Sequence, residues 1–236
     1  MINKKNNWID FWSSYRKIDA DCDADLFIQV GKTINGIPIS SIRLQEMVND
    51  ICSNLNLQSS DSLFEMCCGN GLLTLPLSKI VNKVYAFDFT SDLVATALKF
   101  CNNSNINYTV ADANSNFFNN FKFEEKPTKY LMNDSLAYFK PNELLQIINR
   151  IIEFNRKFTF YLTGVPNNAL MWNFYNTEER KKLYFESVKK GDIFLDGIGN
   201  WWNMQDIYNI AKQFSLECEI INSIDNYRSN ILFKNV

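Results

Sequence analysis

The chain contains no histidine among its 236 residues. This absence excludes serine–histidine and cysteine–histidine catalysis, and metal sites built on imidazole. It also removes the side chain that most often acts as a general base near neutral pH. Any catalysis must therefore use carboxylates, Tyr, Lys, Cys or the positioning of reactants.

A CxxC pair is absent as well. The six cysteines are Cys22, Cys52, Cys67, Cys68, Cys101 and Cys218. In a reducing compartment such cysteines are mostly small buried side chains. No second cysteine pair and no histidine completes a tetrahedral site around the adjacent Cys67 and Cys68. We therefore expect neither a metal site nor a redox couple.

The sequence also lacks long apolar runs and an excess of positive charge. No run approaches the ~20 apolar residues of a membrane span, and no apolar segment follows the lysines near the N-terminus. The 24 Lys and Arg are balanced by 26 Asp and Glu, whereas nucleic-acid binding relies on a basic surface. We expect a cytoplasmic protein without membrane insertion and without a nucleic-acid partner. Its oligomeric state is left open.

Apolar residues make up 46% of the chain, which suits one large domain or one domain with an appendage. Residues 1–60 show helical spacing at 8–18 and 40–57, with a loop between them that contains Gly31, Gly36 and Pro38. We predict a helical N-terminal extension over 1–60, in which Ser40 or Ser41 caps the second helix.

From residue 61 onwards, strands alternate with helices. Strand-like segments lie at 62–67, 84–89, 106–113, 128–136 and 157–165, and helices are expected at 71–81, 91–101 and 142–155. This alternation predicts a parallel α/β sheet that binds ligands at the carboxyl ends of its strands. An aromatic-rich insertion or lid is expected at 166–205, followed by a helix and an antiparallel hairpin. The predicted domain spans 61–236.

Acidic residues stand near the ends of three successive strands: Glu65, Asp88 and Asp112. Gly69 and Gly71 follow the first strand and can adopt positive φ, which lets a ligand approach the backbone. A carboxylate at Asp88 could accept hydrogen bonds from both hydroxyls of a ribose, and Asp112 could lie at an adenine edge. The sequence thus predicts a nucleoside-binding pocket.

This pattern resembles the class I S-adenosylmethionine-dependent methyltransferases. Their first motif, acidic-x-Gly-x-Gly-x-Gly, reads Glu65-Met66-Cys67-Cys68-Gly69-Asn70-Gly71 here, with Cys67 in place of the first glycine. The resemblance implies a Rossmann-like, seven-stranded, mostly parallel sheet and S-adenosylmethionine as cofactor, with no metal. It also implies cofactor contacts by the remaining motif residues, which are Asp88, Phe89, Asp112, Ala113 and Asn133.

The fourth motif matches "LMNDSLAYF" and places Asn133 and Asp134 beside the transferred methyl. Asp134 is the candidate base or orienting group, and the alternative is a loop cap. No Asn/Asp-Pro-Pro-Tyr/Phe run is present, which argues against methylation of base or glutamine amino groups. No Pro-Cys nucleophile is present, which argues against cytosine C5 methylation. Transfer from a sulfonium depends mainly on alignment.

Further residues are candidates for acceptor contacts. "VGKT" imitates the end of a P-loop, but Leu26 stands where that motif needs glycine. Gln29 and Lys32 are instead expected either to fold over the cofactor or substrate or to form a solvated loop. Tyr138 and the aromatic side chains Trp172, Tyr175, Trp201 and Trp202 form either a stacking wall or part of the core.

We expect methyl transfer to an oxygen or nitrogen of a small polar acceptor. "QVGKTINGIPIS" and "MCCGNGLL" resemble a bacterial subgroup found among surface-polysaccharide genes, which implies a sugar or a phosphorylated metabolite of glycan assembly. A small amine is the main alternative. An NAD-dependent oxidoreductase fits less well, because Thr74 replaces the third glycine of its motif. A non-catalytic binding module is the remaining alternative.

Overall fold

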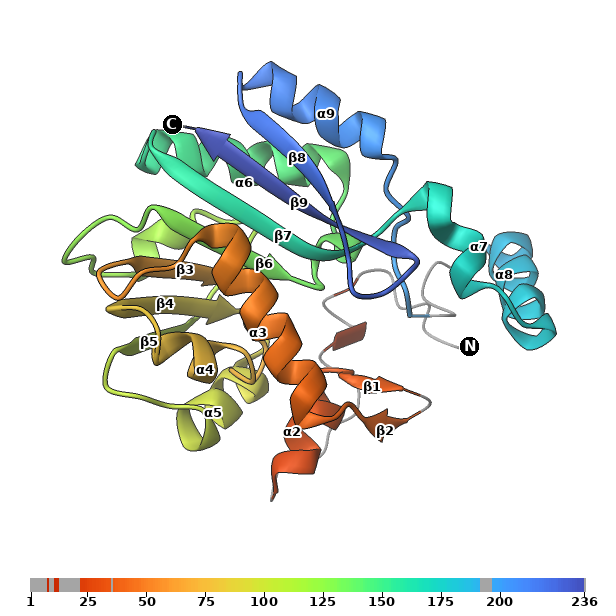
Figure 1. Cartoon of the computed structure of the whole chain (residues 1–236), viewed down its shortest axis with the longest axis horizontal. Coiled ribbons are helices and arrows are strands. Elements are labelled where there is room, and N and C mark those ends of the chain that lie inside the picture. The colour runs from red at the N-terminus through yellow and green to blue at the C-terminus, as the bar shows by residue number, and fades with distance from the viewer. Residues whose placement is uncertain (1–7, 9–10, 13–21, 35, 192–196, 236) are drawn as a thin grey trace. The chain divides into compact units, whose positions relative to one another are not determined.

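A computed structural model describes residues 8, 11–12, 22–34, 36–191 and 197–235 (Figure 1). The helix expected at 8–18 lies largely outside these residues. The chain divides into two compact units, Met1–Leu131 and Met132–Val236, and each is described by itself. None of the helices in the described ranges is long and apolar enough to cross a membrane.

Strands β3 to β9 form a seven-stranded sheet in the order β5-β4-β3-β6-β7-β9-β8. Strand β6 (Lys129–Asn133) contains the boundary between the two units. The pairs β3–β4 and β4–β5 are parallel, whereas β9 is antiparallel to both β7 and β8. This arrangement confirms the predicted Rossmann-like fold with a C-terminal antiparallel hairpin.

In the first unit, β3 (Ser62–Met66), β4 (Lys83–Asp88) and β5 (Ile106–Val110) lie side by side (Figure 1). Helices α3 (Ser41–Leu55), α4 (Thr74–Ser78) and α5 (Ser91–Phe100) belong to the same unit, and a 3₁₀ turn spans Phe117–Asn120. Phe64 is fully buried and has ring contacts with Phe87, Phe117, Phe118, Phe121, Phe123 and Tyr130. An aromatic core therefore fixes β3 and β4.

Of two helices in this unit, one begins where the sequence predicts and the other is shorter than predicted. The Ser40 side chain accepts from the Arg43 N–H at 3.2 Å, which confirms Ser40 as the cap of α3. The helix predicted over 71–81 is only Thr74–Ser78. Its predicted first residues belong to the preceding loop, because Gly71 has a φ of +79°, outside the right-handed helical region.

The segment predicted as a loop before α3 contains short regular elements. Helix α2 spans Asp23–Gln29, and β1 (Thr33–Ile34) pairs with β2 (Ile37–Pro38). Gly36 has a φ of +82° in the turn between these two strands, a conformation that glycine adopts at little cost. Elements this short leave little periodicity in the sequence, which is why the loop prediction was wrong here.

The second unit contains α6 (Pro141–Phe154), β7 (Phe158–Pro166), α9 (Met204–Gln213), β8 (Glu217–Asn222) and β9 (Arg228–Asn235). Helix α6 begins at Pro141, which suits the first helical position because its missing N–H would be unpaired there. Its buried residues recur at helical spacing and are Leu144, Ile147, Ile148 and Ile151.

The aromatic-rich segment after β7 forms short helices: a 3₁₀ turn at Asn168–Leu170, α7 (Met171–Phe174) and α8 (Glu178–Lys190). Tyr175 lies 4.8 Å from Tyr184 and 5.7 Å from Trp201, measured between ring centroids. Phe174 lies 5.0 Å from Tyr227, in the turn before β9. The segment therefore has an aromatic core of its own.

Candidate functional site

The structure brings the three predicted acids of the first unit to one edge of the sheet. Glu65 lies opposite Ala86 in the β3–β4 pair, and Asp88 at the end of β4 lies opposite Val110, the last residue of β5. Asp112 follows β5 by two residues. Because the strands are parallel, all three carboxyl groups belong to their carboxyl ends, where open α/β sheets bind ligands.

The loop that follows β3 has an unusual backbone. Cys67, Gly69 and Gly71 have φ angles of +57°, +57° and +79°. A side chain is strained in this region, which explains why glycine is the ordinary residue at the position of Cys67. A Cβ at Gly69 would lie 2.9 Å from Val30 Cγ1, and one at Gly71 would lie 2.9 Å from Cys101 Cβ. The two glycines thus permit close internal packing as well as the expected approach of a ligand.

Asp88 holds this loop in place. Its Oδ2 accepts from the Gly69 N–H at 3.0 Å, its Oδ1 accepts from the Thr90 N–H at 2.8 Å, and the residue is 5% exposed. Burial raises the pKa of Asp88 by more than these hydrogen bonds lower it. Each carboxylate oxygen has a second lone pair, so the predicted ribose hydrogen bonds are compatible with this loop-holding role.

Glu65 is a buried acid that no counter-charge fully compensates. It is 2% exposed, and its Oε2 has no hydrogen-bond partner within the described part of the chain. Burial, the largest effect, raises the pKa of Glu65 to about 7, while the Thr74 hydroxyl lowers this pKa, Asp88 raises it and Lys32 lowers it. Buried acceptors are normally paired, so this oxygen indicates a missing donor.

A second polar atom of the loop shares this property. The described residues contain six buried side-chain nitrogen or oxygen atoms without a hydrogen-bond partner, and two of them are Glu65 Oε2 and Asn70 Oδ1. S-adenosylmethionine carries an ammonium group and two ribose hydroxyls as donors. The residues present therefore fit the cofactor that the motifs imply.

The remaining cofactor candidates of this unit lie after β4 and β5. Asp112 Oδ1 accepts from the Asn114 N–H at 2.8 Å, so this carboxylate caps its own turn. Phe89 is half-buried beside Asp88, and Ala113 is 3% exposed. All three lie at the strand ends where the sequence predicted them.

The cysteine pair is not arranged for metal or thiolate chemistry. Cys68 is 8% exposed, as predicted, and burial together with Glu65 and Asp88 raises the pKa of its thiol well above the usual value. A thiol in such surroundings stays protonated and unreactive. Among the residues that the structure covers, no group of three or more Cys, Asp or Glu could hold a metal ion.

Helix α2 contacts the loop Cys67–Gly71 through Asn70, a residue that the sequence did not single out. Asn70 Nδ2 donates to Leu26 O at 2.8 Å and to Gln29 Oε1 at 3.0 Å. The predicted residue Gln29 is thus a partner of the loop, and Lys32 lies close enough to influence Glu65. The only signal in the sequence was an amide between two glycines, which needs partners once it is buried.

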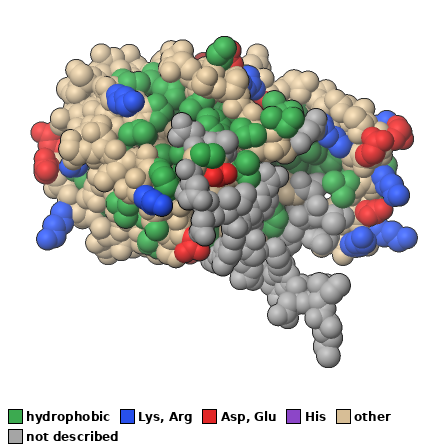
Figure 2. All heavy atoms as spheres, turned by 90° about the horizontal axis from the view of Figure 1, so that it is seen from below, with side chains coloured by type: hydrophobic (Ala, Val, Ile, Leu, Met, Phe, Trp, Pro, Cys, Tyr) green, Lys and Arg blue, Asp and Glu red, His purple; other side chains and the backbone are tan. Residues whose placement is uncertain are grey.

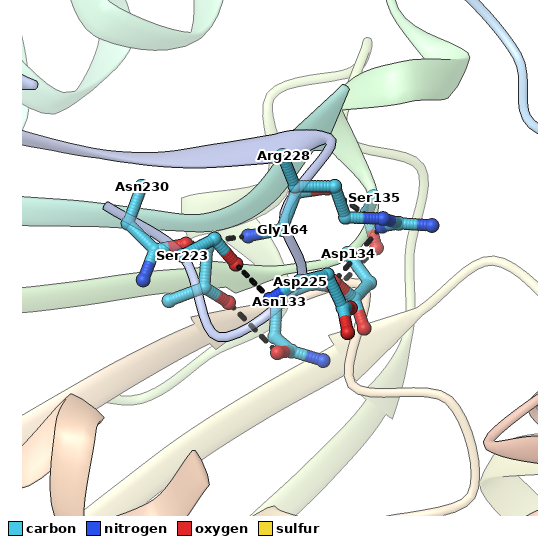
Figure 3. A network of polar contacts seen from close by, with 9 residues as sticks. Asn133, Asp134, Ser135, Gly164, Ser223, Asp225, Arg228 and Asn230 are labelled. Carbon is cyan, nitrogen blue, oxygen red and sulfur yellow. Dashed lines mark hydrogen bonds and ion pairs between the residues drawn. The ribbon is translucent and has the colours of Figure 1, made fainter. Parts of the chain in front are cut away.

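In the second unit, Asp134 forms an ion pair with Arg228 (Figure 3). Arg228 Nη1 lies 3.1 Å from Asp134 Oδ1 and donates to Gly164 O at 2.6 Å. Asp134 has a φ of +51°, and its N–H donates to Thr163 O at 3.0 Å. Burial lowers the pKa of Arg228, but Asp134 and Tyr227 raise it by more, so the guanidinium stays protonated beside this carboxylate.

Asn133 belongs to the same polar network. Its Oδ1 accepts from Thr163 Oγ1 at 2.7 Å, and its carbonyl oxygen accepts from Ser135 Oγ at 2.8 Å. The Gly164 N–H donates to Asn230 Oδ1 at 2.9 Å. Figure 3 shows how these side chains converge from β6, β7 and β9. Residues of β7 and β9 thus hold Asn133 and Asp134 in place.

The predicted aromatic residues occupy different environments. Trp202 is 3% exposed and its Nε1 donates to Leu136 O at 3.0 Å, while Tyr175 is 1% exposed, so both belong to the interior of this unit. Trp201 and Tyr138 are half-buried, and Trp172 is 51% exposed. Trp172, Tyr175, Trp201 and Trp202 therefore do not form one exposed wall.

Comparison with known proteins points to one enzyme class. Residues 63–157 match a family model described as "Methyltransferase domain". The curated relatives include the tRNA/tmRNA (uracil-C(5))-methyltransferase of Campylobacter jejuni strain RM1221, 30% identical over 156 residues. That alignment covers 66% of this chain and 36% of the relative, so the chain spans about a third of the length of the curated relatives it matches.

Solved structures share the fold. Magnesium protoporphyrin IX methyltransferase from Synechocystis PCC 6803, with SAH bound, superposes with a TM-score of 0.59 at 14% identity, covering 97% of this chain and 94% of that one. A plantazolicin methyltransferase in complex with SAH gives a TM-score of 0.58 at 12% identity, covering 83% of this chain and 86% of that one.

Proposed function

Because residues 63–157 form a methyltransferase domain of the class I, S-adenosylmethionine-dependent type, we propose that this chain methylates an oxygen or nitrogen of a small polar acceptor. The observation that carries the proposal is the loop Cys67–Gly71, which Asp88 holds beside the buried carboxyl group of Glu65, whose Oε2 has no hydrogen-bond partner among the described residues. This arrangement presents acceptor atoms to a ligand rich in donors.

Three carboxylates would hold the cofactor. Glu65 would accept from the ammonium of its amino-acid end, Asp88 from the ribose hydroxyls, and Asp112 from the adenine side. When bound, the cofactor supplies a methyl group on a sulfonium, a good leaving group. The protein then needs to align the acceptor and exclude water rather than to provide a strong base, which suits a chain without histidine.

Asp134 is the proposed orienting group for the acceptor. Its carboxylate is fixed by Arg228 and is about one-third exposed, so it can accept a hydrogen bond from a hydroxyl or amine. When the acceptor atom takes the methyl group, the bond from the methyl carbon to the cofactor sulfur would break and leave a neutral thioether, and the proton lost by the acceptor would pass to Asp134 or to water. Asn133 would contact the cofactor beside the transferred methyl.

For the acceptor we propose a sugar or a phosphorylated metabolite of bacterial surface-glycan assembly. Support comes from the resemblance of the segments around Gly31 and Cys68 to enzymes encoded among such genes. Trp172 and the half-buried Trp201 offer aromatic faces on which a sugar ring can stack. A small amine is the alternative, because the same faces and Asp134 suit a cation.

The names of the curated relatives raise tRNA as a further acceptor. On the face shown in Figure 2, the described Lys and Arg side chains are scattered or lie beside acidic ones, without a continuous basic surface. Methylation at carbon also requires activation of the ring, as by addition of a thiolate. The segment "LMNDSLAYF" contains no cysteine. We therefore favour the small acceptor.

We further propose that residues 61–236 are the catalytic domain, that 1–60 is an extension and 166–205 an insertion, and that the protein acts in the cytoplasm.

The experiment that tests the proposed acceptor is a screen that measures release of S-adenosylhomocysteine. Nucleotide sugars, sugar phosphates, small amines and unmodified tRNA form its four arms. Turnover in the sugar arms supports the proposal. Turnover only with tRNA or only with amines contradicts the proposal of a sugar or phosphorylated acceptor. No turnover in any arm favours a non-catalytic module.

A further inference from the structure

Asn70 ties the cofactor loop to helix α2. Its side chain is fully buried at 0% exposure, and its Nδ2 makes the two hydrogen bonds to Leu26 O and Gln29 Oε1. Gln29 is itself 7% exposed. Leu26 and Gln29 precede Asn70 by 44 and 41 positions in the sequence, so these bonds connect the N-terminal segment directly to the loop.

Apolar contacts join the same two segments. Leu26 forms one buried cluster with Leu72 and Cys101, and Phe27, Val30, Leu44 and Leu75 pack against it. Val30 also occupies the space beside Gly69, where any Cβ would meet its side chain. Helix α2 is therefore packed against the loop as well as hydrogen-bonded to it.

The loop needs such support because its backbone is strained. Cys67 adopts a positive φ, and strained residues persist where surrounding contacts determine their conformation. Gly69 is held by Asp88, and the next residue, Asn70, is held by α2. The two attachments fix consecutive residues of the loop.

We propose that Asn70 is a positioning residue of the cofactor site. Through Asn70, helix α2 keeps the loop Cys67–Gly71 in the conformation that binds the cofactor, so the N-terminal segment controls how long the cofactor stays bound. This inference rests on the proposed function, because the ligand is S-adenosylmethionine or its product. A loop held in its bound conformation gives up less freedom on binding, and losing that support shows mainly in the dissociation rate.

Asn70→Asp tests the inference in the full-length protein, with S-adenosylhomocysteine as the probe. The substitution keeps the size of the side chain but replaces both N–H donors with an oxygen that faces two acceptors. We expect the dissociation constant to rise about tenfold, mostly through faster dissociation, as expected for the loss of about one buried hydrogen bond.

Asn105→Asp is the matched control. Asn105 lies in the same unit, and its Nδ2 donates to Ser78 O at 2.7 Å, Val81 O at 3.1 Å and Asn82 O at 3.2 Å. The same chemical change there should lower the unfolding temperature and leave dissociation of S-adenosylhomocysteine unchanged. If both variants lose affinity in proportion to their loss of stability, the positioning role is contradicted.

Gln29→Met supplies a second variant, which decides the question if Asn70→Asp does not fold. It keeps the length of the side chain and removes one acceptor, so we expect about threefold faster dissociation. The inference would be overturned if both variants fold and release S-adenosylhomocysteine at the wild-type rate. If only Gln29→Met folds, a wild-type dissociation rate in that variant would overturn it. Failure of the wild-type protein to bind S-adenosylhomocysteine would instead overturn the proposed function.

Discussion

Arg228 and Asp134 are 94 positions apart, yet Arg228 Nη1 lies 3.1 Å from Asp134 Oδ1 and also binds Gly164 O. The ion pair therefore joins the first residue of β9 to the loop that follows β6. The pair holds the carboxylate of Asp134, a residue whose backbone has a positive φ and therefore depends on surrounding contacts.

Arg228→Met should destabilise the protein, since it leaves a partly buried carboxylate without its cation. We expect a loss of about 2 kcal/mol in the free energy of unfolding, less than for a fully buried pair because Asp134 is about one-third exposed. Arg228→Lys should recover part of this loss. Urea unfolding measures both, with Arg180→Met as a control at an arginine that packs on Phe174. If Arg228→Met and Arg180→Met lose the same free energy of unfolding, the Arg228–Asp134 pair has no special role in stability.

Cofactor affinity should depend on pH through Glu65. Its pKa is about 7 in the free protein, and the ammonium of the cofactor prefers the ionised carboxylate. The dissociation constant for S-adenosylhomocysteine should therefore fall about tenfold from pH 6 to pH 8, because about a tenth of the carboxyl groups are ionised at pH 6 and most are at pH 8. Glu65→Gln should bind more weakly and without this dependence. A steep pH dependence in Glu65→Gln would assign the titration to another group.

The stability of the free protein should show the opposite trend. The pKa of Glu65 is raised on folding from 4.5 to about 7, so its contribution is complete below the unfolded pKa and is lost as pH rises through 7. The loss amounts to at most about 3 kcal/mol at 1.36 kcal/mol per pKa unit. Urea unfolding at pH 5 and pH 8 should show a smaller difference for Glu65→Gln than for the wild type. Identical differences would contradict the raised pKa.

The loop backbone predicts opposite effects for two substitutions. Cys67→Gly should retain binding of S-adenosylhomocysteine and stabilise the protein slightly, by less than about 1 kcal/mol, because glycine accepts a φ of +57° without strain. Gly69→Val should abolish binding, because its side chain would meet Val30. Calorimetry and thermal unfolding measure both. Wild-type affinity in a folded Gly69→Val protein would contradict this account of the loop.

Features that depend on the order of strands and helices along the chain were the predictable ones. Glu65, Asp88 and Asp112 follow from the order of strands and from the rule that parallel strands present their carboxyl ends together. The burial of Cys68 follows from the general tendency of cysteines in a reducing compartment to be buried. The antiparallel hairpin at 217–235 followed from two strand-like runs separated by a turn.

Contacts between distant segments could not be predicted in this way. Arg228 carries no local signal, because its role depends on a partner 94 positions away. Helix α2 is too short to leave a clear period, so its bond to Asn70 was invisible. The sequence also could not separate Trp202 and Tyr175, which are buried, from Trp172, which is exposed.

The central claim is that the loop Cys67–Gly71 and the acids beside it form a site for S-adenosylmethionine. Calorimetry with S-adenosylhomocysteine tests it most directly, in the wild type and in Asp88→Ala. We predict micromolar-range binding by the wild type, weakened at least tenfold in Asp88→Ala, because that variant loses both the hold on Gly69 and the proposed ribose acceptor. No binding by the folded wild-type protein would contradict the account.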